Sequence, residues 1–204
     1  MAGHMNWGDS HTVVVVPVPE LEPFVLARTR HYDAAWVSAD PTFTHAHVTL
    51  FAPWIAEPSE AEMAVLAAIA EQAPRFDVEF AQVEEFPDGT IHLPAEPGEP
   101  LSALMRLVSA AFPDLLPYDG LFGSVDELTP HVTLDRTSAA VDVGSTRDLL
   151  GDLLPVTCTV DRFELHRYAA GDCRVLASFP LGQSERDRQQ HDADQGRHQL
   201  LQRR

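Results

Sequence analysis

The stretch 44–53 reads T-H-A-H-V-T-L-F-A-P, and its core H-V-T-L at 47–50 recurs letter for letter at 131–134. Valine, threonine and leucine favour an extended strand, in which residues two apart share a face. The pattern therefore predicts that each histidine lies beside its threonine on one face, while the valine and leucine turn toward the core. Two such strands meeting at a cleft would present a symmetric pair of imidazoles, each with a hydroxyl.

A single histidine on a strand is more often a hydrogen-bonded structural residue than a catalyst. The repeat of all four letters favours the functional interpretation, in which His47, Thr49, His131 and Thr133 form the catalytic group. Imidazole changes charge near neutral pH, so one ring can take a proton while the other gives one. Phosphoryl transfer suits such a pair, with the hydroxyls donating to non-bridging oxygens. This chemistry needs no metal ion, and we predict no cofactor.

The composition excludes several classes of protein. The chain has 204 residues, 14 basic against 31 acidic, and a net charge of -17; every basic residue is arginine. The absence of lysine excludes a Schiff-base lysine, a P-loop lysine and the adenylated lysine of ATP-dependent ligases. The negative charge disfavours duplex DNA or long RNA and leaves a small phosphate ester or an RNA end as the expected partner. Cys158 and Cys173 lack metal-ligand spacing and are predicted to be reduced thiols.

The domain organisation follows from composition along the chain. Residues 1–11 are interpreted as a cloning scar and flexible N-terminus, 12–182 as one domain of two pseudo-symmetric lobes, and 183–204 as a disordered polar tail. No apolar stretch approaches the length of a membrane span and no signal peptide is recognisable, so we expect a cytoplasmic protein. The oligomeric state stays open.

Periodicity predicts the secondary structure between these boundaries. Alternating or β-branched segments predict strands, and 3.6-residue spacing of apolar residues predicts helices. Ser59 with Glu62 resembles a helix-capping box, and Ser145 is expected to cap a short helix that ends at Leu154. The expected strands are 12–18, 44–53, 76–83, 91–93, 129–136, 156–165 with a bulge near 161–162, and 173–181; the other helices are 20–36 and 101–112.

The two motifs and their surroundings resemble the two-histidine (2H) phosphoesterase superfamily, which includes 2′-5′ RNA ligase-like proteins and 2′,3′-cyclic nucleotide phosphodiesterases. The similarity extends over 12–182 and includes Phe51 and Pro53 after the first motif and Pro130 and Arg136 beside the second. It implies a bilobal, internally duplicated α+β fold, with two antiparallel sheets lining a central cleft and helices on the outside. It also implies that the histidines act as general acid and base and that the threonines hold phosphate.

We therefore predict a metal-independent phosphodiesterase that hydrolyses 2′,3′-cyclic phosphates of nucleotides or RNA ends. The reverse reaction, 2′-5′ RNA ligation, is less favoured because the chain is acidic. Arg136, Arg30, Phe51 and Tyr118 are the predicted substrate-binding residues, although Tyr118 could instead plug its own loop. The sequence does not decide which motif histidine is the acid.

Two other functions stay open. His45 shares a strand face with His47, and His-x-His is a common metal-ligand spacing, so a metal-dependent or cupin-like hydrolase could use this pair with His131 and a carboxylate. Residues 48–56 contain no Asp or Glu at cupin spacing, and the duplicated threonines would then be unexplained. The third function is a non-catalytic nucleotide-binding module, because activity depends on placement to within about half an ångström. His11, His92 and His166 are expected to be structural or surface residues.

Overall fold

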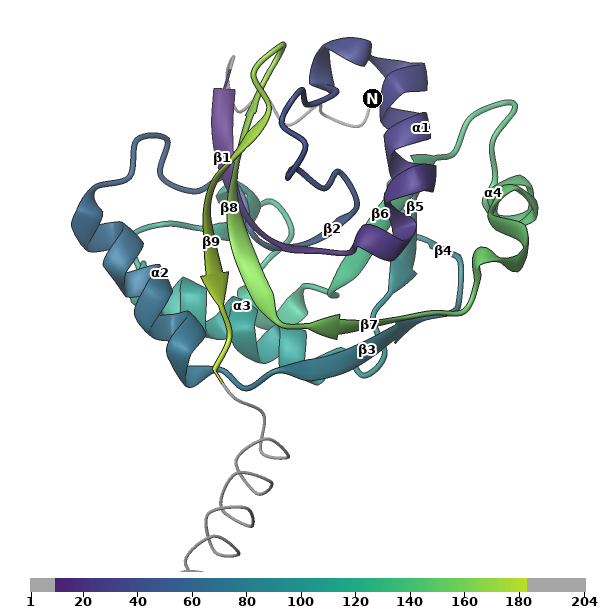
Figure 1. The fold of residues 1–204 in the computed structure, drawn as a ribbon. Coiled ribbons are helices and arrows are strands. Elements are labelled where there is room, and N and C mark those ends of the chain that lie inside the picture. The colour runs from purple at the N-terminus through teal and green to yellow at the C-terminus, as the bar shows by residue number, and fades with distance from the viewer. Residues whose placement is uncertain (1–9, 183–204) are drawn as a thin grey trace, which may run out of the picture.

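A seven-stranded antiparallel sheet lies at the centre of residues 10–182, the part of the chain that the computed structural model describes (Figure 1). Its strand order is β4-β5-β6-β2-β1-β8-β9, and β3 and β7 form a separate two-stranded sheet. With four α-helices, this confirms the predicted α+β class. The strands are β1 Ser10–Pro17, β2 His47–Phe51, β3 Phe76–Phe80, β4 Glu84–Glu85, β5 Thr90–Pro94, β6 His131–Arg136, β7 Val156–Val160, β8 Arg162–Ala169 and β9 Arg174–Pro180; the helices are α1 Glu22–Tyr32, α2 Glu60–Gln72, α3 Glu99–Ala111 and α4 Val143–Leu150.

The two motif strands join the halves of the large sheet. β2 and β6 pair only at Val48 and Val132, whereas β1 pairs with β8 at six positions from Ser10 to Val15. The predicted cleft-lining sheets are thus two halves of one sheet, β4-β5-β6 and β2-β1-β8-β9. The half β2-β1-β8-β9 combines strands from both ends of the described region, because β8 lies beside β1, whereas β4, β5 and β6 come from its middle.

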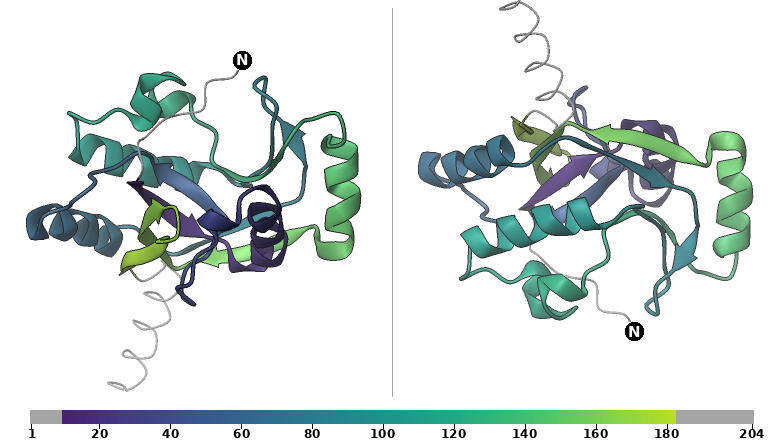
Figure 2. Two further views of the ribbon diagram at one scale, coloured as in Figure 1. Left: turned by 90° about the horizontal axis from the view of Figure 1, so that it is seen from above. Right: turned by 90° about the horizontal axis from the view of Figure 1, so that it is seen from below.

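The main core lies on one face of this sheet. Figures 1 and 2 show α2 and α3 side by side against the sheet, with α4 at the opposite end of the molecule. One buried cluster contains the aliphatic residues of the motif strands, the inward residues of both helices and the buried residues of the β3–β7 sheet. Burial of this apolar surface is the main stabilising contribution and leaves the other face of β2 and β6 available for polar side chains.

Most predicted elements are present, with three corrections. The capping box of Ser59 and Glu62 at the start of α2 is confirmed. Asp142, not Ser145, is the N-cap of α4, because Ser145 lies three residues inside the helix and completes the capping box from there. The helix itself ends at Leu150, ahead of a 3-10 turn. No bulge interrupts a single strand near Asp161; the chain instead passes there from β7 in the small sheet to β8 in the large one.

The ends of the described region bear on the remaining predictions. β1 begins at Ser10, so two residues assigned to the N-terminal segment belong to the sheet. The predictions for 1–9 and 183–204 lie outside the described residues. None of the helices in the described region is long and apolar enough to cross a membrane. Cys158 and Cys173 are both buried free thiols, as predicted.

Candidate active site

The two H-V-T-L motifs lie side by side with the predicted alternation. Val48 and Val132 are opposite each other and fully buried in the core cluster, as are the leucines that follow two residues later. Their neighbours in the motifs project from the other face of the sheet, where all four side chains are at least partly exposed. In an antiparallel register centred on the two valines, His47 lies next to Thr133 and His131 next to Thr49. Each histidine therefore faces the threonine of the other motif.

Both imidazoles are held in the same way. Nδ1 of His47 hydrogen bonds to the carbonyl oxygen of His45 at 2.7 Å, and Nδ1 of His131 bonds to that of Thr129, also at 2.7 Å. A carbonyl accepts only, so Nδ1 carries the proton and Nε2 of each neutral ring has a free lone pair. Within the described residues no hydrogen bond engages either Nε2. The geometry leaves two proton-transfer nitrogens available on one face.

Both motif histidines favour the neutral form. Burial is the main cause that lowers the pKa of His47 to about 4; the nearby imidazole of His166 acts in the same direction, and the bond to the His45 carbonyl opposes them. Burial also lowers the pKa of His131, against the opposing bond to the Thr129 carbonyl. The influence of His131 on the pKa of His47 indicates that the rings are close enough to repel each other when both are protonated.

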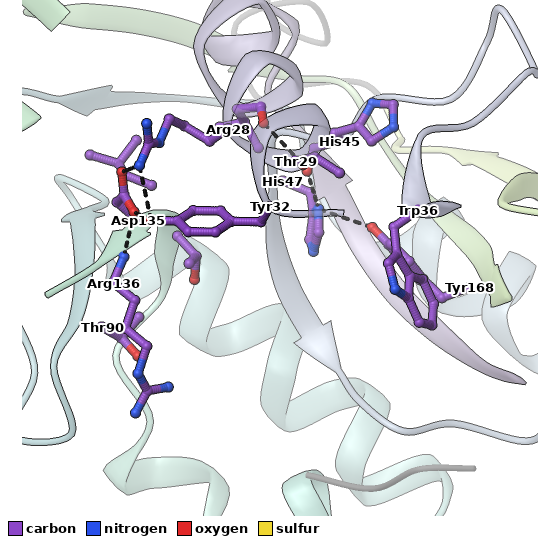
Figure 3. A pocket seen from close by; sticks show the side chains of 13 residues that line it. Arg28, Thr29, Tyr32, Trp36, His45, His47, Thr90, Asp135, Arg136 and Tyr168 are labelled. Carbon is purple, nitrogen blue, oxygen red and sulfur yellow. Dashed lines mark hydrogen bonds and ion pairs between the residues drawn. The ribbon is translucent and has the colours of Figure 1, made fainter. Parts of the chain in front are cut away.

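A cavity of about 360 Å³ lies beside the motifs, between α1 and the sheet (Figure 3). His47 and Thr133 contribute to its wall from β2 and β6. Aromatic side chains form much of the rest, and two arginines supply positive charge. The complete lining is Val25, Arg28, Thr29, Tyr32, Trp36, His45, His47, Thr90, Thr133, Leu134, Asp135, Arg136 and Tyr168.

A charged cluster closes one end of this cavity. Asp135 lies two residues after Thr133 and also lines the cavity; its side chain is fully buried and pairs with the Arg28 guanidinium at 2.5 Å. The Tyr32 hydroxyl also donates to Asp135, and Figure 3 shows the tyrosine extending from α1 toward it. The cluster fixes the helix against the second motif strand. The sequence analysis missed Asp135 and Tyr32, although Asp135 has the same alternation as His131 and Thr133.

The four predicted substrate-binding residues lie in different places. Arg136 lines the cavity, while its guanidinium also donates to the Asp88 carbonyl at 2.8 Å. Arg30 is exposed and lies outside the cavity lining. Arg28, two residues earlier in α1, is part of the lining instead. The prediction for Phe51 was wrong, because its side chain is 0% exposed and belongs to the core.

Tyr118 is close to the first motif but outside the cavity. Its backbone N–H donates to the Ala52 carbonyl at 2.6 Å, and its ring packs against Val13, Val15 and Ala52. Burial raises the pKa of its hydroxyl, and a hydrogen bond with Thr49 acts in the opposite direction. Tyr118 therefore ties the long loop before the second motif to the hydroxyl of the first.

His45 is not arranged as a metal ligand. Its Nδ1 contacts the Glu22 carboxylate at 2.7 Å, and its Nε2 accepts from the Ser38 N–H at 3.1 Å, so both ring nitrogens are engaged. The second Glu22 oxygen accepts from the Ala46 N–H at 2.9 Å. Within residues 10–182 no group of three or more His, Cys, Asp or Glu side chains is spaced to hold a metal ion. Glu22 instead anchors the segment whose carbonyl orients His47, a role that the sequence did not indicate.

Each motif histidine also has a second histidine close by. His92 is buried and stacks on Phe86, with ring centroids 3.6 Å apart, and its own ring lies 5.1 Å from that of His131. His166 is likewise buried, 6.3 Å from the ring of His47. Tyr168 lines the cavity, and its hydroxyl lies 3.4 Å from Nδ1 of His47. The alternation of polar residues in 162–168, R-F-E-L-H-R-Y, was the available signal for His166 and Tyr168.

Comparison with known proteins agrees with this geometry. The sequence pattern of the family described as the 2′-5′ RNA ligase superfamily matches residues 17–172. Similar solved structures include TT0787 of Thermus thermophilus, with 21% identity and a TM-score of 0.54, covering 86% of this chain and 99% of that one. E. coli LigT complexed with 3′-AMP has 19% identity and a TM-score of 0.50, covering 86% and 100%. A structure described as a phosphoesterase has 18% identity, a TM-score of 0.50 and the same coverage. No curated protein sequence matches significantly.

Proposed function

We propose, because this chain belongs to the 2′-5′ RNA ligase superfamily of 2H phosphoesterases, that it is a phosphodiesterase in which His47 and His131 transfer the protons. Membership supports an activity of the phosphodiesterase or ligase type. The finer proposal is hydrolysis of 2′,3′-cyclic phosphates on nucleotides or RNA ends. It needs two proton-transfer groups and donors for the phosphate oxygens on one accessible surface.

The shared orientation of the two imidazoles carries this proposal. Each Nδ1 is bound to the carbonyl oxygen two residues earlier, which fixes the neutral tautomer and directs the basic Nε2 away from the backbone. Histidines that only stabilised the fold would not need the same Nδ1 hydrogen bond on both motif strands. The register around Val48 and Val132 adds a threonine hydroxyl next to each ring.

In the proposed hydrolysis, one imidazole takes a proton from the attacking water while the other, protonated, gives its proton to the ribose oxygen that leaves phosphorus. A bond forms between phosphorus and the water oxygen, and one bond from phosphorus to a ribose oxygen breaks in line with it. Thr49 and Thr133 donate hydrogen bonds to the non-bridging oxygens, whose charge is redistributed in the transition state. With a ribose 5′-hydroxyl in place of water, the same displacement joins RNA ends through a 2′-5′ linkage: the bond from phosphorus to the 3′ oxygen breaks, and that oxygen takes the proton.

The cavity supports a nucleotide as the substrate. Its volume of about 360 Å³ is within the range of small-ligand sites, and the rings of Tyr32, Trp36 and Tyr168 offer surfaces for a base. Arg28 is paired with Asp135, whereas no described carboxylate forms an ion pair with Arg136. Arg136 is therefore the proposed partner of substrate phosphate. That LigT, a fold relative, was crystallised with 3′-AMP motivates the choice of nucleotides for the test.

The test is an assay of the purified chain against the four 2′,3′-cyclic mononucleotides, a 2′-5′-linked dinucleotide and a generic aryl phosphodiester. We expect turnover of at least one cyclic nucleotide, and a loss of about 10² to 10⁴ in rate for His47→Ala and for His131→Ala. His31→Ala, which removes an exposed histidine of α1 outside the cavity lining, is the matched control and should retain the wild-type rate.

Two results would contradict the proposal. Binding of cyclic nucleotides without turnover would favour the non-catalytic binding module. A His131→Ala protein that keeps the wild-type rate on every cleaved substrate would show that the second motif is only a repeat of the fold.

A further inference from the structure

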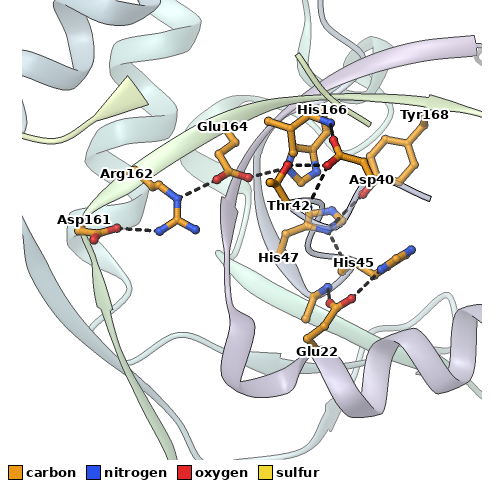
Figure 4. Close-up of polar contacts among 12 residues, drawn as sticks. Glu22, Asp40, Thr42, His45, His47, Asp161, Arg162, Glu164, His166 and Tyr168 are labelled. Carbon is orange, nitrogen blue, oxygen red and sulfur yellow. Dashed lines mark hydrogen bonds and ion pairs between the residues drawn. The ribbon is translucent and has the colours of Figure 1, made fainter. Parts of the chain in front are cut away.

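A pair of buried polar side chains on β8 lies behind His47. Glu164 and His166 flank the core residue Leu165, so they project from the sheet face that carries the motif histidines. Glu164 is 4% exposed and His166 is 0% exposed. Figure 4 shows the two side chains in contact, with His47 close to the imidazole of His166. Burial of two ionisable groups is unfavourable unless they are paired, so their contacts decide what they do.

Glu164 is a buried carboxylate held between an imidazole and a guanidinium. Its Oε2 contacts Nε2 of His166 at 2.8 Å, and its Oε1 accepts from Nε of Arg162 at 2.7 Å. Burial alone would raise the pKa of Glu164, but the hydrogen bonds from His166 and Arg162 lower it. Arg162 also pairs with Asp161 at 3.1 Å, so Glu164 shares its guanidinium with a second carboxylate. The carboxylate beside His166 is therefore favoured in its ionised form.

The opposite side of the His166 ring faces no hydrogen-bonding partner. Its Nδ1 is buried, and no described residue bonds to it. Phe43 covers the ring with centroids 4.3 Å apart, and the ring of His47 lies 6.3 Å away at an angle of 63°. A buried ring nitrogen without a partner is unusual and does not help to hold the fold together.

The two rings differ in the charge of their partners. The partners of Nδ1 of His47 are neutral, the His45 carbonyl at 2.7 Å and the Tyr168 hydroxyl at 3.4 Å, whereas His166 contacts a carboxylate. Two imidazolium ions at this separation repel each other, so protonation of one disfavours protonation of the other. The carboxylate that would stabilise a single positive charge on this pair lies beside His166.

The other ionisable groups near the two rings do not reverse this preference. Glu22 of α1 is engaged by His45 and the Ala46 N–H, and Asp40 in the loop before β2 is engaged by Thr42 and the Val175 N–H. No described carboxylate forms an ion pair with His47. The remaining groups that face this region are the imidazoles of His45, two residues before His47, and of His131 from β6, the guanidinium groups of Arg28 from α1 and Arg136 from β6 in the cavity lining, and the Tyr168 hydroxyl from β8.

We propose that His166, held by Glu164, is a positioning residue that takes up the one proton this pair of rings can hold and thereby adds to the effect of burial in keeping His47 neutral as the base of the reaction. The assignment of the base rests on the proposed function. Nε2 of His47 then accepts the proton of the attacking water, and His131 supplies the proton for the leaving ribose oxygen. The neighbour of His131 differs, because His92 stacks on Phe86 and forms no ion pair among the described residues. The two halves of the site are therefore electrostatically unequal.

The first experiment follows the histidine side chains of the intact chain by NMR while the pH is lowered. We expect His166 to become protonated at a higher pH than His47. In Glu164→Gln, which keeps the size of the side chain and removes its charge, the protonation of His47 should move up by about one pH unit. Glu79→Gln, which removes an exposed carboxylate of β3, is the matched control and should leave it unchanged.

Protonation of His47 before His166 in the native chain would overturn the proposal, as would a Glu164→Gln protein with unchanged titration of His47. The wild-type measurement needs no variant to fold. Because it also needs no substrate, it stands apart from the phosphodiesterase assay.

The second experiment is kinetic. In both Glu164→Gln and His166→Gln, the acidic limb of the profile of kcat/KM against pH should move to higher pH by about one unit. A lower rate with an unmoved acidic limb would show that the pair only supports the fold, and would refute its control of His47.

Discussion

Replacing His47 with Gln should make the free energy of unfolding less dependent on pH, because protonation of His47 in the unfolded chain destabilises the native fold as the pH falls below neutrality. In the folded chain the pKa of His47 is lowered to about 4, mainly by burial and then by His166, from the ordinary value of 6.5 that applies in the unfolded chain. Well above pH 6.5 the ring is neutral in both states. Below it, the unfolded chain binds a proton that the folded chain does not bind until about pH 4, so stability falls across this window.

The size of the effect follows from linkage. One proton contributes about 1.4 kcal/mol per pH unit, so between about pH 7.5 and about pH 5 the native chain should lose about 2 kcal/mol through His47 alone. Urea unfolding of the wild type, His47→Gln and His31→Gln at both pH values measures this, with tryptophan fluorescence as the signal. Groups other than His47 and His31 titrate in all three proteins, so the wild type and His47→Gln differ only in the His47 ring and His31→Gln shows the effect of losing an exposed one.

We expect the stability of His47→Gln to fall by about 2 kcal/mol less than that of the wild type over this interval, which exceeds the usual error of such measurements. His31→Gln, at an exposed site on α1, controls for the loss of an imidazole as such. Equal pH dependence in the wild type and His47→Gln would refute the reasoning, because it would mean that folding does not disfavour the charged form of His47.

Three further predictions address the site and its scaffold. Thr133→Val removes an exposed hydroxyl from the cavity wall and should lower kcat by about 10² to 10³ with little change in unfolding free energy; wild-type kinetics would show that the hydroxyl does not contact phosphate. A chelator should leave turnover unchanged, and inhibition reversed by a divalent ion would restore the metal-dependent alternative. Ser59→Ala breaks the capping box of α2 and should destabilise the fold by about 1 kcal/mol in urea without changing kcat, whereas unchanged stability would contradict the contribution of the cap.

Local sequence determined which side chains share a face, and it did so correctly for the two motifs. The alternation in H-V-T-L requires only the two-residue period of a strand, and the buried valines and leucines confirm it. The capping box at Ser59 is also a local pattern, complete within four residues. The repetition of the tetrapeptide predicted for the same reason that the two motifs belong together, and β2 and β6 do pair at Val48 and Val132.

Tertiary structure alone decided which strands and helices surround those motifs. Tyr32 and Asp135 are 103 positions apart and meet only because α1 packs along β6. The sequence did not predict which face of α1 is buried, because E-P-F-V-L-A-R-T-R-H-Y mixes apolar and charged residues around the helix. It therefore did not show that Arg28, and not Arg30, faces the cavity. Likewise, β8 takes its place beside β1 through backbone hydrogen bonds that any extended segment can form, so neither the burial of Glu164 and His166 nor their approach to His47 is encoded in a local period. Periodicity specifies the face of an element, whereas its neighbours follow from packing the whole chain.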